Sequence, residues 1–315
     1  MIKIASQLAH INTVAIAGHV RPDGDCIGSC MGLYLYIKEN YPGIKADIYL
    51  EKPREGFSFI EGFDEIKTEC SEGLEYDLFI TLDASTADRI GVAMPCFSKA
   101  QKRLCIDHHI SNTGFGDVNV IHPEVGSTGE ILYEMLEETR ISKSVAEALY
   151  MAIAHDTGVF QYEATTSRTM EIAGKLMDMG IPFSKILEES YFSKSYVQNQ
   201  ILGRCLVESM LILDKTCIVS YVKQKDLDFY NVTPKDLDGV INQLRKTRGA
   251  EVAIFLYEAG NQEYKVSMRS KESVDVQEVA AYFQGGGHVR AAGCTMHGSI
   301  DDVINNLTCQ IEKQL

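Results

Sequence analysis

The feature that most constrains this chain is a series of short apolar runs, each followed by polar residues and then by a helical or turn-like stretch. The first run, Thr13–Gly18, precedes a polar turn and the helical pattern of Ile27–Tyr41. Further runs lie at Ala46–Leu50, Asp77–Leu82 and Arg103–Ile106. Strands that alternate with helices are typical of a mainly parallel sheet with helices on its faces. The pattern predicts an α/β fold for the first part of the chain.

The second part of the chain follows a different pattern. Apolar residues recur at helical spacing from Ser127 to about Tyr191, and a new series of strands and helices starts beyond residue 193. A chain of 315 residues also exceeds the ~100 to 200 residues over which one hydrophobic core usually extends. We therefore expect a first domain over residues 1–192, a linker over residues 193–200 and a smaller α/β domain over residues 201–315, with a substrate cleft between the domains.

The charge balance is acidic and uneven. The chain carries 44 Asp and Glu against 30 Lys and Arg, a net charge of -14, and most of the excess lies before residue 195. Such a field repels polyanions, which argues against a long nucleic-acid duplex as a partner. The acidic first domain is typical either of a solvated surface or of carboxylates that are gathered for cations.

The cysteines and the apolar runs indicate the cellular compartment in which the protein resides. Nine cysteines occur without a CxxC pair, which argues against a zinc knuckle and favours a reducing compartment. The first residues lack the apolar core of a leader, and no run approaches the ~18 apolar residues of a spanning helix. We expect a cytoplasmic protein with no membrane partner.

Aspartates and histidines follow the expected strands and one helix. They stand after three of the strands and at the end of a helix, at positions His19, Asp23, Asp25, Asp83, Asp107, His108, His109 and Asp156. Because the carboxyl ends of parallel strands line one crevice, we expect these side chains to converge. Carboxylates and imidazoles without thiolates suit Mn²⁺ or Mg²⁺ more than structural zinc, and so many ligands fit two ions that share a carboxylate.

This ordered set resembles the DHH phosphoesterase superfamily, whose name comes from the triplet Asp107-His108-His109. Within it the chain is similar to the branch of nanoRNases and pAp phosphatases, the NrnA type. The resemblance implies two divalent cations, with Mn²⁺ preferred over Mg²⁺ or Co²⁺. The implied ligands are His19 and Asp23 for one ion, Asp25, His108 and Asp156 for the other, and Asp83 as the bridge.

The same resemblance implies two further roles. Asp107 supports the site or contacts the edge of an ion, and His109 contacts the scissile phosphate or protonates the leaving oxygen. His155, directly before Asp156, departs from the pattern of many relatives. It is either a partner of a ligand or a packed core histidine, since adjacent residues on a helix point in different directions.

The expected second domain contains a candidate phosphate-binding motif. Arg269 ends a strand pattern, and the segment Gln284-Gly285-Gly286-Gly287-His288 follows a helical pattern. Glycines let backbone N–H groups approach a phosphate, and an arginine adds a bidentate contact, although a glycine run alone is more typical of a flexible turn. The resemblance to the family's DHH-associated domain implies that the nucleotide end of the substrate is bound by Arg269, Gly285, Gly286, Gly287 and His288.

The expected function is hydrolysis of very short RNA oligonucleotides, and of 3'-phosphoadenosine 5'-phosphate (pAp) to AMP and phosphate, with two metal ions. Two other functions stay open, namely a phosphodiesterase for cyclic dinucleotides or pApA and a catalytically silent nucleotide-binding module. Pyrophosphatases and polyphosphatases rank lower because, as families, they lack the GGGH domain. A RecJ-like exonuclease is disfavoured by the small size and acidity of the chain. The resemblance is also consistent with a homodimer.

Overall fold

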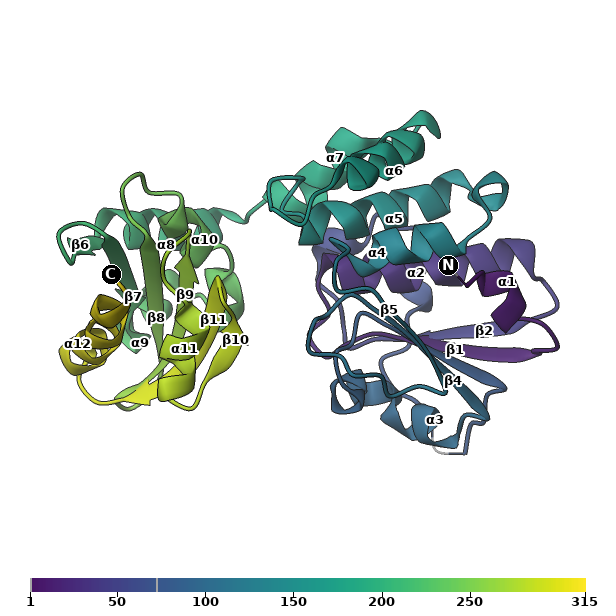
Figure 1. Ribbon diagram of the computed structural model, residues 1–315, viewed down its shortest axis with the longest axis horizontal. Coiled ribbons are helices and arrows are strands. Elements are labelled where there is room, and N and C mark those ends of the chain that lie inside the picture. Colours follow the sequence, from purple (N-terminus) through teal and green to yellow (C-terminus); the bar gives the residue numbers. More distant parts are fainter. Residues whose placement is uncertain (1, 72) are drawn as a thin grey trace. The chain divides into compact units, whose positions relative to one another are not determined.

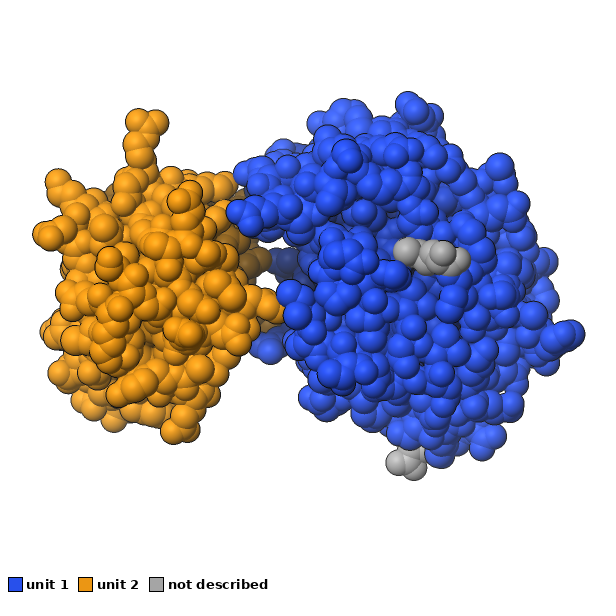
Figure 2. Space-filling view, viewed as in Figure 1, with its two compact units in different colours: residues 1–193 blue, residues 194–315 orange. Residues whose placement is uncertain are grey.

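The computed structural model describes residues 2–71 and 73–315, and these divide into two compact units. Unit 1 spans Met1–Ser193 and unit 2 spans Lys194–Leu315 (Figure 2). The expectation of a linker over residues 193–200 is wrong, because helix α8 (Tyr196–Val207) already begins within it. Ser195 caps this helix by accepting a hydrogen bond from the backbone N–H of Gln198. The segment looked like a linker because the first turn of α8 is polar.

Unit 1 is built on a five-stranded sheet in which all strands are parallel, so the prediction of a mainly parallel α/β fold is confirmed (Figure 1). The strand order is β2-β1-β3-β4-β5. The strands are β1 (Thr13–Ala17), β2 (Lys45–Tyr49), β3 (Leu78–Leu82), β4 (Lys102–Asp107) and β5 (Val118–Ile121). This order places the carboxyl ends of β1, β3 and β4 side by side at one edge.

Helices cover both faces of this sheet (Figure 1). Helices α2, α4 and α5 lie on one face and α3 lies on the other. The helices are α1 (Ile4–Gln7), α2 (Gly24–Asn40), α3 (Met94–Lys99), α4 (Thr128–Met135), α5 (Lys143–Asp156), α6 (Ser167–Asp178) and α7 (Phe183–Leu187). Shorter turns are η1 (Glu55–Phe57), η2 (Phe63–Glu65), η3 (Ala87–Ala93), η4 (Glu138–Arg140) and the π-helical η5 (Glu188–Phe192).

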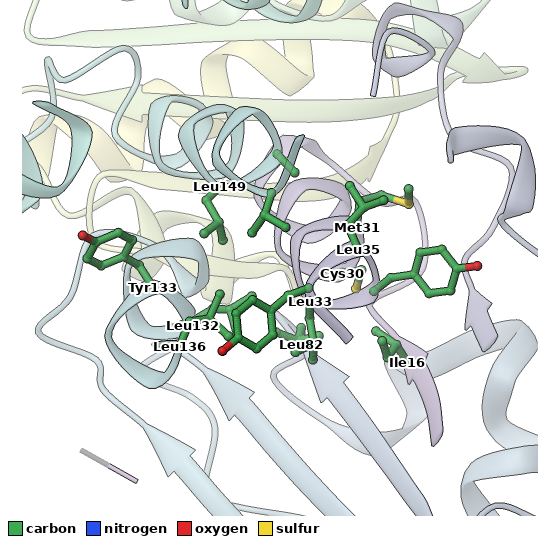
Figure 3. Close-up of a cluster of buried hydrophobic side chains, with 14 of the residues drawn as sticks. Ile16, Cys30, Met31, Leu33, Leu35, Leu82, Leu132, Tyr133, Leu136 and Leu149 are labelled. Atoms are coloured by element: carbon green, nitrogen blue, oxygen red, sulfur yellow. The ribbon is translucent and has the colours of Figure 1, made fainter. Parts of the chain in front are cut away.

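The main core of unit 1 lies between the sheet and α2. Residues 24–37 of α2 are all buried, because the helix has strands beneath it and α4 and α5 beside it. Figure 3 shows Leu33 of α2 among Ile16, Leu82, Leu132 and Leu149, which come from two strands and two helices. Alternate strand residues face the opposite side and pack on α3. The first residues of α2 are thereby fixed close to the strand ends.

Unit 2 contains a six-stranded mixed sheet of order β10-β11-β9-β8-β7-β6, in which only β7 and β8 are parallel. The strands are β6 (Met210–Ile212), β7 (Cys217–Val222), β8 (Val252–Gly260), β9 (Glu263–Ser270), β10 (Gly286–His288) and β11 (Ala291–His297). The remaining elements are α9 (Gln224–Tyr230), η6 (Pro234–Leu237), α10 (Val240–Arg245), α11 (Val276–Tyr282), α12 (Ile300–Ile311) and η7 (Glu312–Gln314). Helices α11 and α12 pack on one face of the sheet, whereas α8, α9 and α10 pack on the other.

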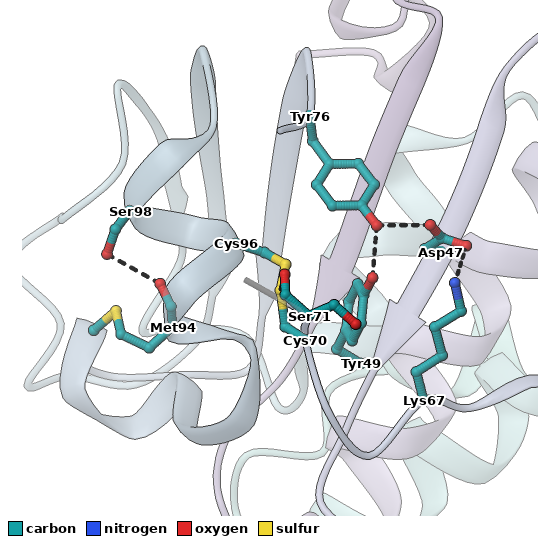
Figure 4. Close-up of a disulfide and its surroundings, with 9 residues drawn as sticks. All are labelled: Asp47, Tyr49, Lys67, Cys70, Ser71, Tyr76, Met94, Cys96 and Ser98. Carbon is teal, nitrogen blue, oxygen red and sulfur yellow. Dashed lines mark hydrogen bonds and ion pairs between the residues drawn. A yellow bond between two sulfur atoms is a disulfide. The ribbon is translucent and has the colours of Figure 1, made fainter. Parts of the chain in front are cut away.

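A disulfide joins Cys70 to Cys96 of α3, with 6.3 Å between the Cα atoms (Figure 4). This pair differs from the expectation of reduced thiols, because a count of cysteines does not reveal which distant residues the fold brings together. Beside the pair, Asp47 accepts hydrogen bonds from Lys67 Nζ and Tyr76 Oη, both at 2.6 Å. The described part of the chain has no helix with the length and apolar character needed to cross a bilayer.

Candidate metal centre

The loop after β1 delivers His19 to the edge of the sheet. Nδ1 of His19 lies 2.8 Å from the carbonyl oxygen of Val20, which fixes the ring. Nε2 then lies 3.6 Å from Asp23 Oδ1 and 3.5 Å from Asp83 Oδ2. Asp23 also caps α2, since its carboxylate accepts a hydrogen bond from the N–H of Cys26. The structure thus brings His19, Asp23 and Asp83 together.

Asp25 is fully buried at the start of α2 and its carboxylate is held by three donors. Its Oδ1 accepts hydrogen bonds from Ser29 Oγ and from the N–H of Gly129, both at 3.0 Å, and its Oδ2 accepts one from the N–H of Thr128 at 2.7 Å. Thr128 and Gly129 form the first turn of α4, whose N–H groups have no partner within the helix. The N-terminus of α4 therefore sets the position of Asp25.

Asp83 lies in the middle of the cluster. Its backbone has a φ of 57°, which turns the chain sharply at the end of β3. The hydroxyl of Thr128 donates to Asp83 Oδ1 at 3.0 Å. Asp83 also approaches His108 Nε2 at 3.6 Å, in addition to its contact with His19. One carboxylate thus faces both imidazoles, as a bridging ligand would.

His108 supplies the strongest geometric sign of a cation. Its Nε2 is buried and makes no well-directed hydrogen bond within the described residues. The nearest atoms are carboxylate oxygens of Asp156 at 3.1 Å, Asp83 at 3.6 Å and Asp25 at 3.8 Å. A buried nitrogen surrounded by carboxylates is the arrangement expected of a ligand whose ion is needed to complete the site. Around His108 the residues present therefore fit a divalent cation with oxygen and imidazole ligands, whereas the group around His19 and Asp83 also contains the buried thiol of Cys26.

The charges of this cluster are balanced poorly by protein groups alone. Burial and the neighbouring Asp83 and Asp156 carboxylates raise the pKa of Asp25 well above its usual range. Burial lowers the pKa of His108, but the carboxylates of Asp156, Asp25 and Asp83 outweigh it and raise the pKa to about 10. Without cations the cluster thus retains protons, and divalent cations would replace those protons.

Asp107 and His109 form a hydrogen-bonded pair at the border of this cluster, where His109 Nδ1 also lies 3.7 Å from Asp83 Oδ1. Asp107 is fully buried, and its Oδ1 lies 2.7 Å from His109 Nδ1 and accepts from the N–H of His108 at 2.9 Å. Its Oδ2 accepts from Asn112 Nδ2 at 2.7 Å. These donors occupy both carboxylate oxygens, so the geometry favours a supporting role for Asp107 rather than direct ion contact.

His155 packs in an aromatic cluster. Its ring centroid lies 5.5 Å from that of Phe57 and 5.2 Å from that of Tyr191. A Cβ on Gly24 would come within 2.0 Å of the ring, so the start of α2 rests directly on His155. Of the two interpretations, this geometry favours the packed histidine, one that supports the loop carrying Asp23 and Asp25.

In unit 2, the glycine motif forms a strand rather than the flexible turn that a glycine run alone would suggest. Gly286–His288 is β10, which pairs with β11. A Cβ on Gly285 or Gly287 would lie 2.3 Å from Gly293 O or 2.4 Å from Ala291 O, so close packing of β11 requires both glycines.

The pairing of β10, β11 and β9 brings the two polar residues of the motif into one row. His288 lies opposite Ala291, and Ala291 lies opposite Arg269. Residues directly opposite one another point to the same face, so Arg269 and His288 flank the small Ala291 with about 10 Å between their backbones. This row places a guanidinium and an imidazole on one face of the sheet, and the guanidinium donates a hydrogen bond from Nη1 to the carbonyl oxygen of Met268 at 3.0 Å.

Three supporting residues were missed by the sequence analysis, namely Ser29, Thr128 and Asn112. For Thr128 a signal was available, since Ser127 and Glu130 have the spacing of a helix N-terminus and place Thr128 in the first turn. Ser29 and Asn112 carry no comparable local signal, because their partners become visible only in the folded chain.

Comparisons with known proteins agree with this geometry. Residues 13–153 match the DHH family, N-terminal domain, and residues 214–314 match the DHHA1 domain. The bifunctional oligoribonuclease and PAP phosphatase NrnA of Bacillus subtilis is 27% identical over 291 residues, which cover 91% of this chain and 90% of that protein. The protein of the same name from Thermus thermophilus is 26% identical over 289 residues, which cover 90% of this chain and 84% of that protein.

A solved structure shares the whole fold. The exopolyphosphatase-related protein from Bacteroides fragilis superposes with a TM-score of 0.89 at 23% identity, covering 98% of this chain and 94% of that one. One matched domain lies in each unit, and the first contains most of the carboxylate and histidine cluster. The chain therefore belongs to the DHH family, with a DHH domain in unit 1 and a DHHA1 domain in unit 2.

Proposed function

We propose that this protein is a metal-dependent phosphoesterase that hydrolyses very short RNA oligonucleotides and pAp. The observation that carries the proposal is the position of Asp83 between two groups of ligands, one with His19 and the other with His108. The names of the NrnA relatives support the choice of substrates. The acidic net charge of -14 fits small substrates better than a long duplex.

Each residue of the cluster has a proposed task. His19 and Asp23 would hold one cation, Asp25, His108 and Asp156 would hold the other, and Asp83 would contribute to both. When bound, such ions neutralise charge at the phosphoryl group and make a water molecule more acidic. We propose Mn²⁺ as the ion of first choice, since the oxygen and imidazole ligands suit it.

His109 is the proposed residue that contacts the scissile phosphate or protonates the leaving oxygen. With Nδ1 hydrogen-bonded to Asp107, the other ring nitrogen is the one left for the substrate. In unit 2, Arg269, the Gly285–Gly287 backbone and His288 are proposed to bind the nucleotide end of the substrate, using the row that flanks Ala291. A cytoplasmic location, which is inferred from the cysteines and the apolar runs, and a homodimer, which the family resemblance implies, belong to the same proposal.

The test is release of phosphate and nucleotides by the purified protein with Mn²⁺ and, in parallel, with EDTA. The substrates are pAp, pApA, a dinucleotide, a 5-mer, a 24-mer RNA and pyrophosphate. We expect turnover of pAp and the shortest RNAs, abolished by EDTA and by Asp83→Ala but retained by Asp64→Ala, which removes an exposed aspartate of unit 1. Turnover of only the 24-mer or only pyrophosphate would contradict the proposal, and nucleotide binding without turnover would favour a silent binding module.

A further inference from the structure

Asn112 is a buried side chain that joins two parts of the site. It closes the turn that follows the histidine pair, since its N–H donates to the carbonyl oxygen of His109 at 3.1 Å. Its Nδ2 donates to Asp107 Oδ2 at 2.7 Å and to the carbonyl oxygen of Ala84 at 3.1 Å. Its Oδ1 accepts from the N–H of Gly114 at 2.8 Å. Only 7% of the residue is exposed.

The hydrogen bonds of Asp107 show why this contact matters. Oδ1 faces His109 and the N–H of His108, and within the described residues Oδ2 has a single side-chain donor, Asn112. Because Asp107 is fully buried, loss of that donor would leave Oδ2 of this carboxylate without a side-chain donor. The carboxylate would then turn to find another donor, and the ring of His109 that is bonded to it would turn as well.

The hydrogen bond from Asn112 to the carbonyl oxygen of Ala84 extends the same constraint to Asp83. Ala84 directly follows Asp83, whose left-handed backbone is held on its other side by a hydrogen bond from its N–H to Ile106 O at 3.0 Å. The amide of Asn112 therefore bridges the end of β4 and the turn after β3. A single side chain thus ties the Asp107–His109 pair to the backbone that carries the central carboxylate.

We infer that Asn112 is a positioning residue for the reaction, which acts by fixing Asp107 and through it the ring of His109. The inference rests on the proposed function of His109. A residue of this kind leaves substrate affinity and cation binding largely intact but lowers turnover, because the group it orients acts in the transition state.

The test is a double-mutant cycle that combines Asn112→Ala with His109→Ala. We expect Asn112→Ala to lower kcat for pAp by about 10- to 100-fold, with KM and the bound Mn²⁺ changed less than about threefold. In the His109→Ala background the same change should lower kcat less than about twofold, since the group it positions is gone. Asn119→Ala is the matched control, because Asn119 only closes the neighbouring turn at Phe115 and Gly116, and it should retain activity in both backgrounds.

A second readout does not depend on activity. Nitrogen-15 NMR of histidine-labelled protein should show the Nδ1 proton of His109 in the wild type and in Asn119→Ala, and its loss or rapid exchange in Asn112→Ala. If Asn112→Ala fails to fold, Asn112→Ser replaces it, because serine keeps an oxygen for the turn but cannot reach Asp107. The serine variant should show the same effects that are expected of Asn112→Ala. Equal losses of kcat in both His109 backgrounds, or an unchanged Nδ1 proton, would overturn the inference. Absence of any turnover by the wild type would instead overturn the proposed function, and the NMR result would then decide the inference alone.

Discussion

Replacement of Gly28 by alanine tests how the position of Asp25 relative to Asp156 is set. Gly28 lies where α2 meets α5, and a Cβ there would be 2.5 Å from the carbonyl oxygen of Ala148 and 2.8 Å from the Cβ of Ala152. Ordinary contact begins near 3.4 Å, so the two helices would have to separate by about 0.9 Å. The closest atom is backbone and cannot move aside as a side-chain tip can.

Two opposing effects decide the magnitude. Alanine in place of a helical glycine gains about 1 kcal/mol, whereas overpacking of a close-packed interior costs about 1 to 3 kcal/mol, and backbone contact favours the upper end. We expect Gly28→Ala to be less stable than the wild type by about 2 kcal/mol. Since α2 carries Asp25 and α5 ends at Asp156, the same separation should lower kcat about 10- to 100-fold, as displacements near 1 Å do.

The assay is urea unfolding followed by far-UV circular dichroism, with the hydrolysis of pAp measured on the same samples. The control is Gly174→Ala in α6, where a Cβ would meet no atom within 4 Å. This control should be more stable than the wild type by about 0.5 to 1 kcal/mol, with unchanged activity. If Gly28→Ala were as stable as Gly174→Ala, the close approach of the helices would not be what requires glycine.

Three further predictions concern cations, pH and the disulfide. Mn²⁺ at about 100 times its dissociation constant should raise the free energy of unfolding by about 2.7 kcal/mol for each ion bound, and Asp83→Ala should abolish this increase in a denaturation series with and without EDTA. In EDTA the urea midpoint should fall as pH rises from 6.5 to about 10, because folded His108 keeps a proton that the unfolded chain releases. His108→Ala should reduce the dependence of the unfolding free energy on pH by about one proton. An unchanged dependence would mean that His108 is not the titrating group. Alkylation under denaturing, non-reducing conditions should leave Cys70 and Cys96 unlabelled, and peptide mapping that finds both labelled would refute the pairing.

Much of unit 1 could be predicted because each strand is a short apolar run with polar residues directly behind it. The residues after β1, β3 and β4 meet at one sheet edge, as the rule for parallel strands requires, and the rings of His19 and His108 lie there 3.5 and 3.6 Å from the Asp83 carboxylate. The edge strand β5 was missed. It has four residues and only Val120 is buried, so the apolar run that marks a buried strand is absent.

Other features could not be predicted because they depend on contacts between distant residues. The capped start of α8 resembled a linker, since only Ile201 and Cys205 of this helix are buried. The motif Gly286–His288 forms a strand because β11 packs closely against it, which no local propensity indicates. Two of the three donors that hold Asp25 come from α4, about a hundred residues further along the chain.

The wide spacing of the site residues along the chain has a consequence for biosynthesis. His19 follows β1 and Asp156 ends α5, so ribosomes adding ~5 to 20 residues per second need roughly 7 to 27 s to make the last ligand after the first. Contacts of such large sequence separation form late in folding. The Asp25, His108 and Asp156 group is therefore incomplete until α5 has been synthesised. It exists only after the sheet and both flanking helices have assembled, and a nascent chain that ends before α5 contains His19 and Asp83 but lacks the complete second group.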